Sequence, residues 1–169
     1  MSKIGASAAK TVGILRTLGF THVLMIPDSE SRRLFDAVEA DDTLQLITPC
    51  REGESVAIAA GLWTGGRKPL LVIQNTGFME AGDALRGCGL GPKVPLRLII
   101  GWRGYGGAMA GKHPIDSAYT YTELLLHALG NPFWYLMSDA DLGAIEAMDR
   151  KAAETSMPAA VVTGYAFRP

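Results

Sequence analysis

The chain has 169 residues, with 16 lysines and arginines against 17 aspartates and glutamates and a formal net charge of -1. This length is enough for one domain with a full hydrophobic core. The balanced charge, without a basic face or an acidic tail, argues against a nucleic-acid partner. Hydrophobic residues make up 48% of the chain and there are 20 glycines, which is typical of a compact α/β domain or of one that also buries surface against a partner.

Two cysteines, Cys50 and Cys88, are too few for a disulfide framework, so a cytoplasmic protein is expected. The first 20 residues alternate polar and apolar at helical spacing, which is unlike a signal peptide. The longest apolar runs, such as 96–101, are far too short to span a bilayer.

The first half of the chain alternates helix and strand. Apolar residues at helical spacing predict a helix over 3–18, which Gly19 can end. A short apolar strand over 22–26 stops at Pro27, after which Asp28 or Ser29 can cap a helix. The elements predicted from there are a helix over roughly 30–39, a strand over 44–47, a helix over 52–64, a strand over 69–74 and a short helix near 78–86.

The second half continues the alternation. It is predicted to contain a glycine-rich loop over 87–93, a strand over 95–101, an irregular glycine-rich stretch over 102–115, a helix over 117–129, a strand over 133–136, a helix over 139–154 and a strand over 159–163. Six strands separated by helices predict an α/β, three-layer fold with a doubly wound, mostly parallel sheet and right-handed crossovers. No repeat or linker divides the chain, so residues 1–169 are expected to form a single domain.

A ligand site is expected at the carboxyl ends of the strands. Continuous apolar runs at 23–26, 70–73 and 98–100 are typical of strands buried on both faces of a sheet. Open α/β sheets bind ligands in the loops that leave such strands. Glu52 places a carboxylate at the start of an otherwise small and apolar helix, and charge beside a buried interface is costly unless a partner takes it up. We therefore expect Glu52 to meet a ligand.

Four segments in register carry a resemblance to a known family. They are Ile26-Pro27-Asp28-Ser29, Arg51-Glu52-Gly53 with Ala57 to Gly61, Gln74-Asn75-Thr76-Gly77, and Ile99-Ile100-Gly101-Trp102-Arg103-Gly104. Together they make the chain resemble, over nearly its whole length, the pyrimidine-binding domain of thiamine-diphosphate-dependent decarboxylases. The likeness is to the alpha subunit of sulfopyruvate decarboxylase and to the N-terminal half of phosphonopyruvate decarboxylase.

The resemblance implies a cofactor and residues that hold it. Glu52 would hydrogen-bond the aminopyrimidine ring of thiamine diphosphate and favour its imino tautomer, and the cofactor would act as the electron sink while carbon dioxide leaves. The residues that would line the pyrimidine are Gln74, Asn75, Thr76 and Gly77.

The resemblance also implies residues near the substrate. Asp28 lies where related decarboxylases carry a catalytic acid, and His113 lies in the glycine-rich loop where they often place a histidine; together they could protonate the intermediate that releases the aldehyde. Arg103 and Lys112 are the cations available for a sulfonate or phosphonate, and Ser29 is a further candidate for substrate binding. The neighbours of His113 differ from those in phosphonopyruvate decarboxylases.

The half of the enzyme that binds the diphosphate is not recognisable in the chain. The family's Gly-Asp-Gly segment with a later Asn, which binds the diphosphate through Mg²⁺, does not occur. The expectation is therefore a split enzyme in which a separate beta subunit holds diphosphate and magnesium, the active site lies at the interface, and this chain supplies no metal ligand. The substrate would be 3-sulfopyruvate, giving sulfoacetaldehyde and carbon dioxide, or 3-phosphonopyruvate.

Simpler interpretations stay open for most of these residues. Glu52 could serve only to stabilise its helix through the helix dipole, and Asp28 could be only an N-cap. Arg103 could bind a helix end or a partner carboxylate, and His113 could have no role. Two other functions also stay open: another 2-oxo acid decarboxylase or carboligase of the same fold, or a stand-alone nucleotide-binding module. The last is disfavoured because no Gly-x-Gly-x-x-Gly turn follows the first strand.

Overall fold

The computed structural model describes residues 4–113 and 116–169 as alternating strands and helices. The strands are β1 (His22–Met25), β2 (Gln45–Ile47), β3 (Pro69–Gln74), β4 (Arg97–Gly101), β5 (Phe133–Tyr135) and β6 (Ala159–Thr163). The α-helices are α1 (Ala8–Thr17), α2 (Arg32–Glu39), α3 (Glu52–Thr64), α4 (Asn75–Glu80), α5 (Gly82–Ala84), α6 (Tyr105–Met109), α7 (Ser117–Ala128) and α8 (Gly143–Thr155). A π-helical turn, η1 (Leu85–Leu90), and a 3₁₀ turn, η2 (Asp139–Asp141), complete the described elements.

The six strands form one sheet in the order β2-β1-β3-β4-β6-β5, and every pair in it is parallel. The predicted fold class is thereby confirmed. The register aligns Gln74 of β3 with Gly101 of β4, and Gly101 with Thr163 of β6. The carboxyl ends of the three central strands therefore lie level with one another, which positions the loops that follow them at one edge.

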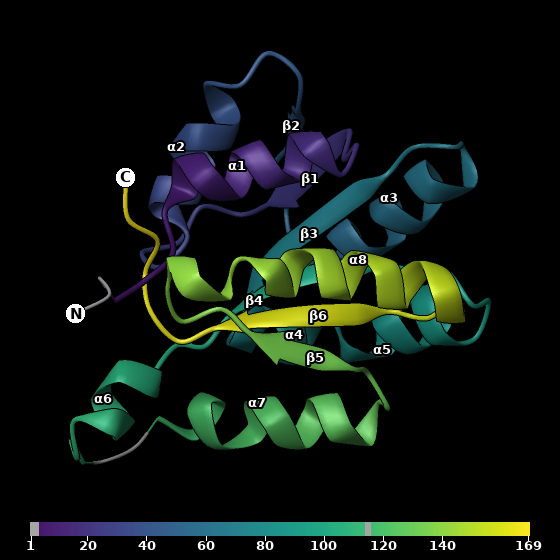
Figure 1. The fold of residues 1–169 in the computed structure, drawn as a ribbon. Coiled ribbons are helices and arrows are strands. Elements are labelled where there is room, and N and C mark those ends of the chain that lie inside the picture. The colour runs from purple at the N-terminus through teal and green to yellow at the C-terminus, as the bar shows by residue number, and fades with distance from the viewer. Residues whose placement is uncertain (1–3, 114–115) are drawn as a thin grey trace.

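Helices cover both faces of the sheet and give the fold three layers (Figure 1). Helices α1, α2 and α8 bury their apolar sides on one face, and α3, α4 and α7 bury theirs on the other. Alternate residues of β3 enter the two cores: Leu70 and Val72 pack with the first set of helices, and Leu71 and Ile73 with the second. Because both faces are covered, the central strands are apolar over most of their length, and their polar residues, such as Arg97 and Gln74, lie at strand ends.

The structure differs from the predicted elements at four places. Helix α1 begins at Ala8 rather than near residue 3, because Ser7 caps it and residues 4–7 instead form isolated bridges with Ser138 and Arg168. Helix α4 begins directly at Asn75, so the polar segment after β3 is helical and not a loop. Two segments predicted as irregular contain helical residues: the end of η1 falls in 87–93, and α6 falls in 102–115. Glycine-rich sequence concealed both, since glycine lowers helix propensity without forbidding helix.

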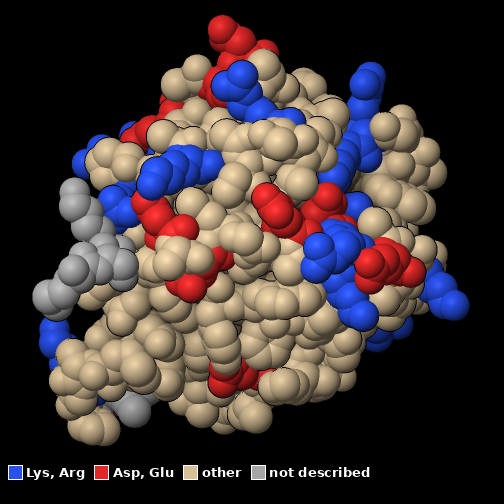
Figure 2. Space-filling model, viewed as in Figure 1, with Lys and Arg blue, Asp and Glu red and all other residues tan. Residues whose placement is uncertain are grey.

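The face shown in Figure 2 mixes both signs of charge over α1, α2 and α8, while the surface over α7 is largely uncharged. No single-sign patch dominates this face. Within residues 4–113 and 116–169, none of the helices combines the length and apolar character needed to cross a membrane.

A capping box at the start of η2 offers a test of local stability. The Ser138 hydroxyl accepts a hydrogen bond from the Ala140 amide at 3.3 Å, and the Asp141 carboxylate accepts one from the Ser138 amide at 2.9 Å. Because Ser138 is buried, Ser138→Ala is expected to lower the free energy of unfolding by about 1 kcal/mol. Urea denaturation checks this, with exposed Ser117→Ala as the control. Equal midpoints for the two variants would contradict the prediction.

Candidate functional site

The candidate site lies where the chain reverses its direction of winding. From β1 the chain moves outward to β2, with α2 on one face, and returns through α3 on the other face to β3 on the far side of β1. The carboxyl ends of strands flanking such a switch point are where open α/β sheets bind ligands. The loop after β1, the start of α3 and the start of α4 meet at this edge.

Glu52 and Gly77, which the sequence predicts as parts of one site, are brought into contact. Glu52 is the first residue of α3 and is half-buried, and Gly77 lies in the first turn of α4. A Cβ atom on Gly77 would lie 2.4 Å from the Glu52 carboxyl carbon and from its Oε1. A side chain at residue 77 would therefore displace the carboxylate from this position. Within the described part of the chain, no hydrogen bond reaches that carboxylate.

The other acids around the start of α3 are engaged with protein groups. The Glu54 carboxylate accepts a hydrogen bond from the Cys50 amide at 2.7 Å, so Glu54 acts as a capping acid. Glu80 on α4 accepts the Gly53 amide at 2.7 Å and pairs with the Arg51 guanidinium. The Glu80 contacts join α3 to α4, and of the acids at the start of α3 it is Glu52 whose carboxylate is left open to a ligand.

The segment after β3 separates into buried and accessible parts. Asn75 is fully buried, and its side-chain amide donates to the Arg103 carbonyl at 3.1 Å and to the Thr122 hydroxyl at 3.0 Å. Gln74 is half-buried and Thr76 is exposed, with the Thr76 hydroxyl donating to the Gln74 side-chain oxygen at 3.0 Å. Asn75 thus joins the start of α4 to the loop after β4 and to α7 through buried hydrogen bonds. Gln74 and Thr76 lie at the surface of the site.

Asp28 shapes the turn between β1 and α2. One of its oxygens accepts the Glu30 amide at 2.7 Å and the Ser31 amide at 2.9 Å, and the other accepts the Ser31 hydroxyl at 2.7 Å. Asp28 therefore holds the turn before α2 and is not the N-cap of that helix, which is Ser31, and its half-buried carboxylate remains at the edge of the site. Ser29 is exposed on the same turn.

Glu30 is a site residue that the sequence analysis missed. Its Oε2 atom is buried without a hydrogen-bond partner among the described residues, and it lies 3.2 Å from where a Cβ of Gly101 would be. Burial, followed by the nearby charge of Asp28, raises the pKa of Glu30 to about 7, with Arg103 opposing the shift and Asp116 adding to it. The sequence does contain a signal for Glu30. It is a second acid two residues after Asp28, in the loop that leaves β1, and Gly101 ends the strand β4.

Arg103 is engaged with the start of α7. Its Nε and Nη2 atoms lie 3.0 and 2.9 Å from Oδ2 of Asp116, the residue that caps α7. The amide of Ala118 and the Arg103 guanidinium together hold the pKa of the Asp116 carboxyl below its usual value. About half of the Arg103 side chain, 52%, stays accessible to solvent, so the guanidinium can still meet an anion.

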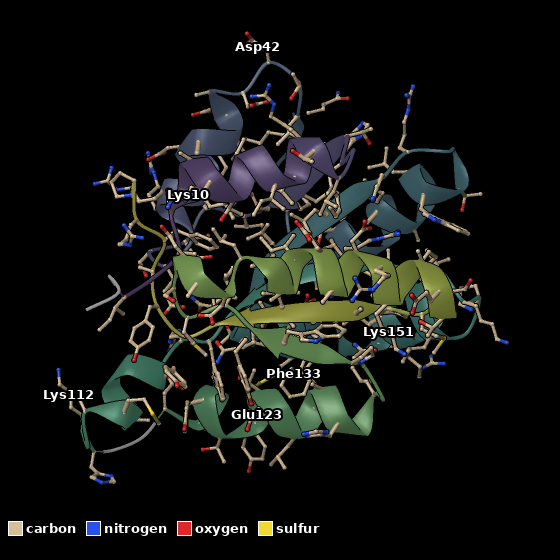
Figure 3. All side chains as sticks on the ribbon, in the orientation of Figure 1. Lys10, Asp42, Lys112, Glu123, Phe133 and Lys151 are labelled. Atoms are coloured by element: carbon tan, nitrogen blue, oxygen red, sulfur yellow. The ribbon has the colours of Figure 1, made fainter. Side chains whose placement is uncertain are left out.

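Lys112 and His113 lie farther out than the other predicted residues. Both are exposed on the turn that follows α6, and Figure 3 places the labelled Lys112 side chain at the outer end of that helix. Gly104, which caps the start of α6, has a φ of +93°, which favours glycine. Residues 114 and 115 of the predicted irregular stretch lie outside the described residues.

An aromatic cluster borders the site on the side of β6. Trp102 stacks on Tyr119 with ring centroids 5.1 Å apart and lies 4.9 Å from the Tyr105 ring. A Cβ on Gly164 would lie 2.3 Å from the Tyr105 ring, so glycine after β6 lets this ring close over the strand end. A hollow of about 380 Å³ lies among this cluster and Tyr135. Spacing could not reveal the cluster, because its members come from three separate segments.

The chain is similar in sequence to two kinds of decarboxylase. The chain is 34% identical over 97 residues to a phosphonopyruvate decarboxylase of Streptomyces viridochromogenes, which covers 57% of this chain and 24% of that protein. It is 30% identical over 101 residues to the sulfopyruvate decarboxylase subunit alpha of Methanococcus maripaludis, 60% of each chain, and 26% identical over 132 residues to that of Methanothermobacter thermautotrophicus, 78% of each. The chain is a homologue of these decarboxylases.

The extent of the match differs between the two kinds of relative. The chain spans about a quarter of the length of the phosphonopyruvate decarboxylase and 60% of the Methanococcus alpha subunit. No protein-family model matches the chain. The described residues contain no group of three or more His, Cys, Asp or Glu side chains that could hold a metal ion.

Proposed function

We propose that this homologue is the pyrimidine-binding alpha subunit of a thiamine-diphosphate-dependent decarboxylase that converts 3-sulfopyruvate into sulfoacetaldehyde and carbon dioxide. The observation that carries the proposal is the Glu52 carboxylate, held against Gly77 at the switch point of the sheet with its oxygens not bonded to any described residue. The similarity to three sulfopyruvate decarboxylase alpha subunits supports the substrate.

The residues present fit the pyrimidine part of thiamine diphosphate. A ring nitrogen that carries a proton needs an acceptor, and the half-buried Glu52 carboxylate supplies one beside a glycine that leaves space. Gln74 and Thr76 would line the ring from the surface of the site, and Asn75 would hold their helix in place from beneath. The relatives are named subunit alpha, which implies a partner subunit. In this proposal that partner, a beta subunit, holds the diphosphate and Mg²⁺.

When bound, thiamine diphosphate supplies the electron sink for loss of carbon dioxide. In this proposal the chain orients the pyrimidine and moves protons around it. Glu52 shares a proton with the ring nitrogen, and Asp28 and His113 are the candidates for protonating the product carbon. Arg103 holds the substrate's sulfonate, aided by Ser29 and Lys112, because guanidinium matches a three-oxygen anion better than ammonium does.

3-Phosphonopyruvate is the alternative substrate, and one observation favours it. The relative with 34% identity is named a phosphonopyruvate decarboxylase. Both substrates carry a three-oxygen anion on a 2-oxo acid, so Arg103 and Lys112 would serve either.

The test measures aldehyde release from 3-sulfopyruvate, 3-phosphonopyruvate and pyruvate. The full chain is assayed alone and in complex with a candidate diphosphate-binding subunit, with thiamine diphosphate and Mg²⁺ present. We expect turnover only in the complex, with the preferred acid naming the substrate and pyruvate barely processed. If a complex shown to contain the cofactor releases no aldehyde from either anionic acid, the proposed reaction is wrong and another 2-oxo acid or a carboligation takes its place.

A further inference from the structure

Glu30 is a buried acid that the proposed reaction does not yet use. Among the described residues, four buried side-chain atoms lack a hydrogen-bond partner, and Glu30 Oε2 is the single carboxyl oxygen of the four. A carboxylate is stable in the interior only when donors satisfy it. The close approach of Gly101, and the absence of a donor on Oε2 within the described chain, therefore favour the neutral acid over the carboxylate at this place.

The charges around Glu30 come from three elements. Asp28 lies on its own turn, Arg103 follows β4, and Asp116 begins α7. The two acids oppose ionisation of Glu30, and the one cation favours it. Burial and Asp28 prevail, so the pKa of Glu30 is raised to about 7. The acid therefore changes charge close to neutral pH, between pH 6 and pH 8.

The charge of Arg103 acts on Glu30, and in the proposed function Arg103 also binds the substrate. Its guanidinium contacts Asp116 through Nε and Nη2 at a single carboxylate oxygen, and within the described residues no ion pair joins it to Glu30. An ionised Glu30 would be a second carboxylate that attracts the same guanidinium. It would also add negative charge at the strand end where an anionic substrate approaches.

We propose that Glu30 is a positioning residue that controls anion binding: as a neutral acid it leaves Arg103 available to the sulfonate or phosphonate of the substrate, and as a carboxylate it competes for Arg103 and repels that anion. This inference rests on the proposed function, because there Arg103 is the group that holds the substrate. Glu30 acts through Arg103 and need not touch the substrate itself.

The first test needs no catalysis. Binding of methanesulfonate to the full chain is followed by the NMR signal of the Arg103 side-chain N–H at pH 6 and pH 8. If only the protonated form binds, affinity at pH 8 is expected to be about tenfold weaker than at pH 6, in proportion to the remaining protonated fraction. Glu30→Gln is neutral at all pH and is expected to show equal affinities. The same loss of affinity in wild type and Glu30→Gln would overturn the inference.

Direct titration of Glu30 in the wild-type chain gives a second test, which does not depend on whether the variant folds correctly. The carboxyl carbon of Glu30 is followed by NMR in the wild-type chain and assigned by comparison with Glu30→Gln. A midpoint near pH 7 supports the inference, and a midpoint near the ordinary value of 4.5 refutes it. The exposed Glu39 at the end of α2 gives a matched control, because Glu39→Gln is expected to leave both the Glu30 titration and methanesulfonate binding unchanged.

The active complex supplies the third readout. With the anionic 2-oxo acid that the reconstitution identifies, KM is expected to rise above pH 7 in wild type and to stay flat in Glu30→Gln, while kcat below pH 7 is similar in both. A Glu30→Gln complex that loses kcat at every pH with unchanged KM would make Glu30 a proton donor and refute the positioning role. Failure of the proposed reaction alone would appear as absent turnover together with pH-dependent methanesulfonate binding.

Discussion

Replacing Glu52 by glutamine is expected to reduce decarboxylation about a hundred- to ten-thousandfold, the range that a positioned acid or base contributes. Glutamine keeps the size of the side chain but cannot take up a proton from a ring nitrogen. The half-buried carboxylate accepts no hydrogen bond from the described residues, so its loss should leave α3 and its packing intact. Turnover of the assembled complex is measured together with thermal unfolding of the chain.

The chain offers a matched control for this variant. Glu54 lies two residues later on the same helix and accepts a hydrogen bond from the Cys50 amide. Glu54→Gln carries the same chemical change and retains an acceptor oxygen, so its turnover should stay close to wild type. Full activity in Glu52→Gln, with cofactor bound, would show that Glu52 has no role in the reaction. The proposed function would then lose its main support.

Adding one methyl group at Gly77 is expected to have the second largest effect. In Gly77→Ala the new Cβ would lie 2.4 Å from Glu52 Cδ, Cγ and Oε1, so the carboxylate or the start of α4 must move. Displacement of a reacting group by about 1 Å can cost a hundredfold in rate. The free energy of unfolding should change little, because the half-buried Glu52 side chain is flexible and can turn away. Both quantities are measured, by turnover of the complex and by urea unfolding of the chain.

Two comparisons make this prediction sharp. Gly82→Ala adds a methyl group on the adjacent helix α5, where nothing lies within 4 Å, and should leave turnover unchanged. In the Glu52→Gln background, Gly77→Ala should produce little further loss of turnover, because both changes act on one carboxylate. Independent, multiplying losses in the double variant would show that Gly77 does not act through Glu52.

Much of the fold could be predicted because its signals are local. Apolar runs such as Leu70 to Ile73 predict strands that are buried on both faces. Between the strands, apolar residues recur at helical spacing, which predicts the crossover helices. The errors lie where a tertiary contact overrides local preference. The segment 4–7 pairs with Ser138 and Arg168 instead of extending α1, and no pattern within the segment indicates those distant partners.

The candidate site was predictable to the extent that single residues break a pattern. Glu52 is conspicuous as a charge opening an apolar helix, and Gly77 as a glycine after a strand. Glu30 is different, because a second acid in a turn looks like an ordinary capping residue. Its raised pKa depends first on burial, beside Gly101, and then on the charge of Asp28. Burial by distant segments, like the smaller effects of Arg103 and Asp116, cannot be inferred from spacing along the chain.

The all-parallel sheet has a consequence for how this chain folds. Each strand pair requires a crossover connection, so the described sheet cannot begin from a hairpin between neighbouring strands. Folds built on pairings distant in sequence fold slowly, since loop closure must precede the contacts that reward it. The apolar edges of β3 and β4 are therefore exposed to other chains for longer during synthesis, and conditions that slow production of the chain should improve its yield.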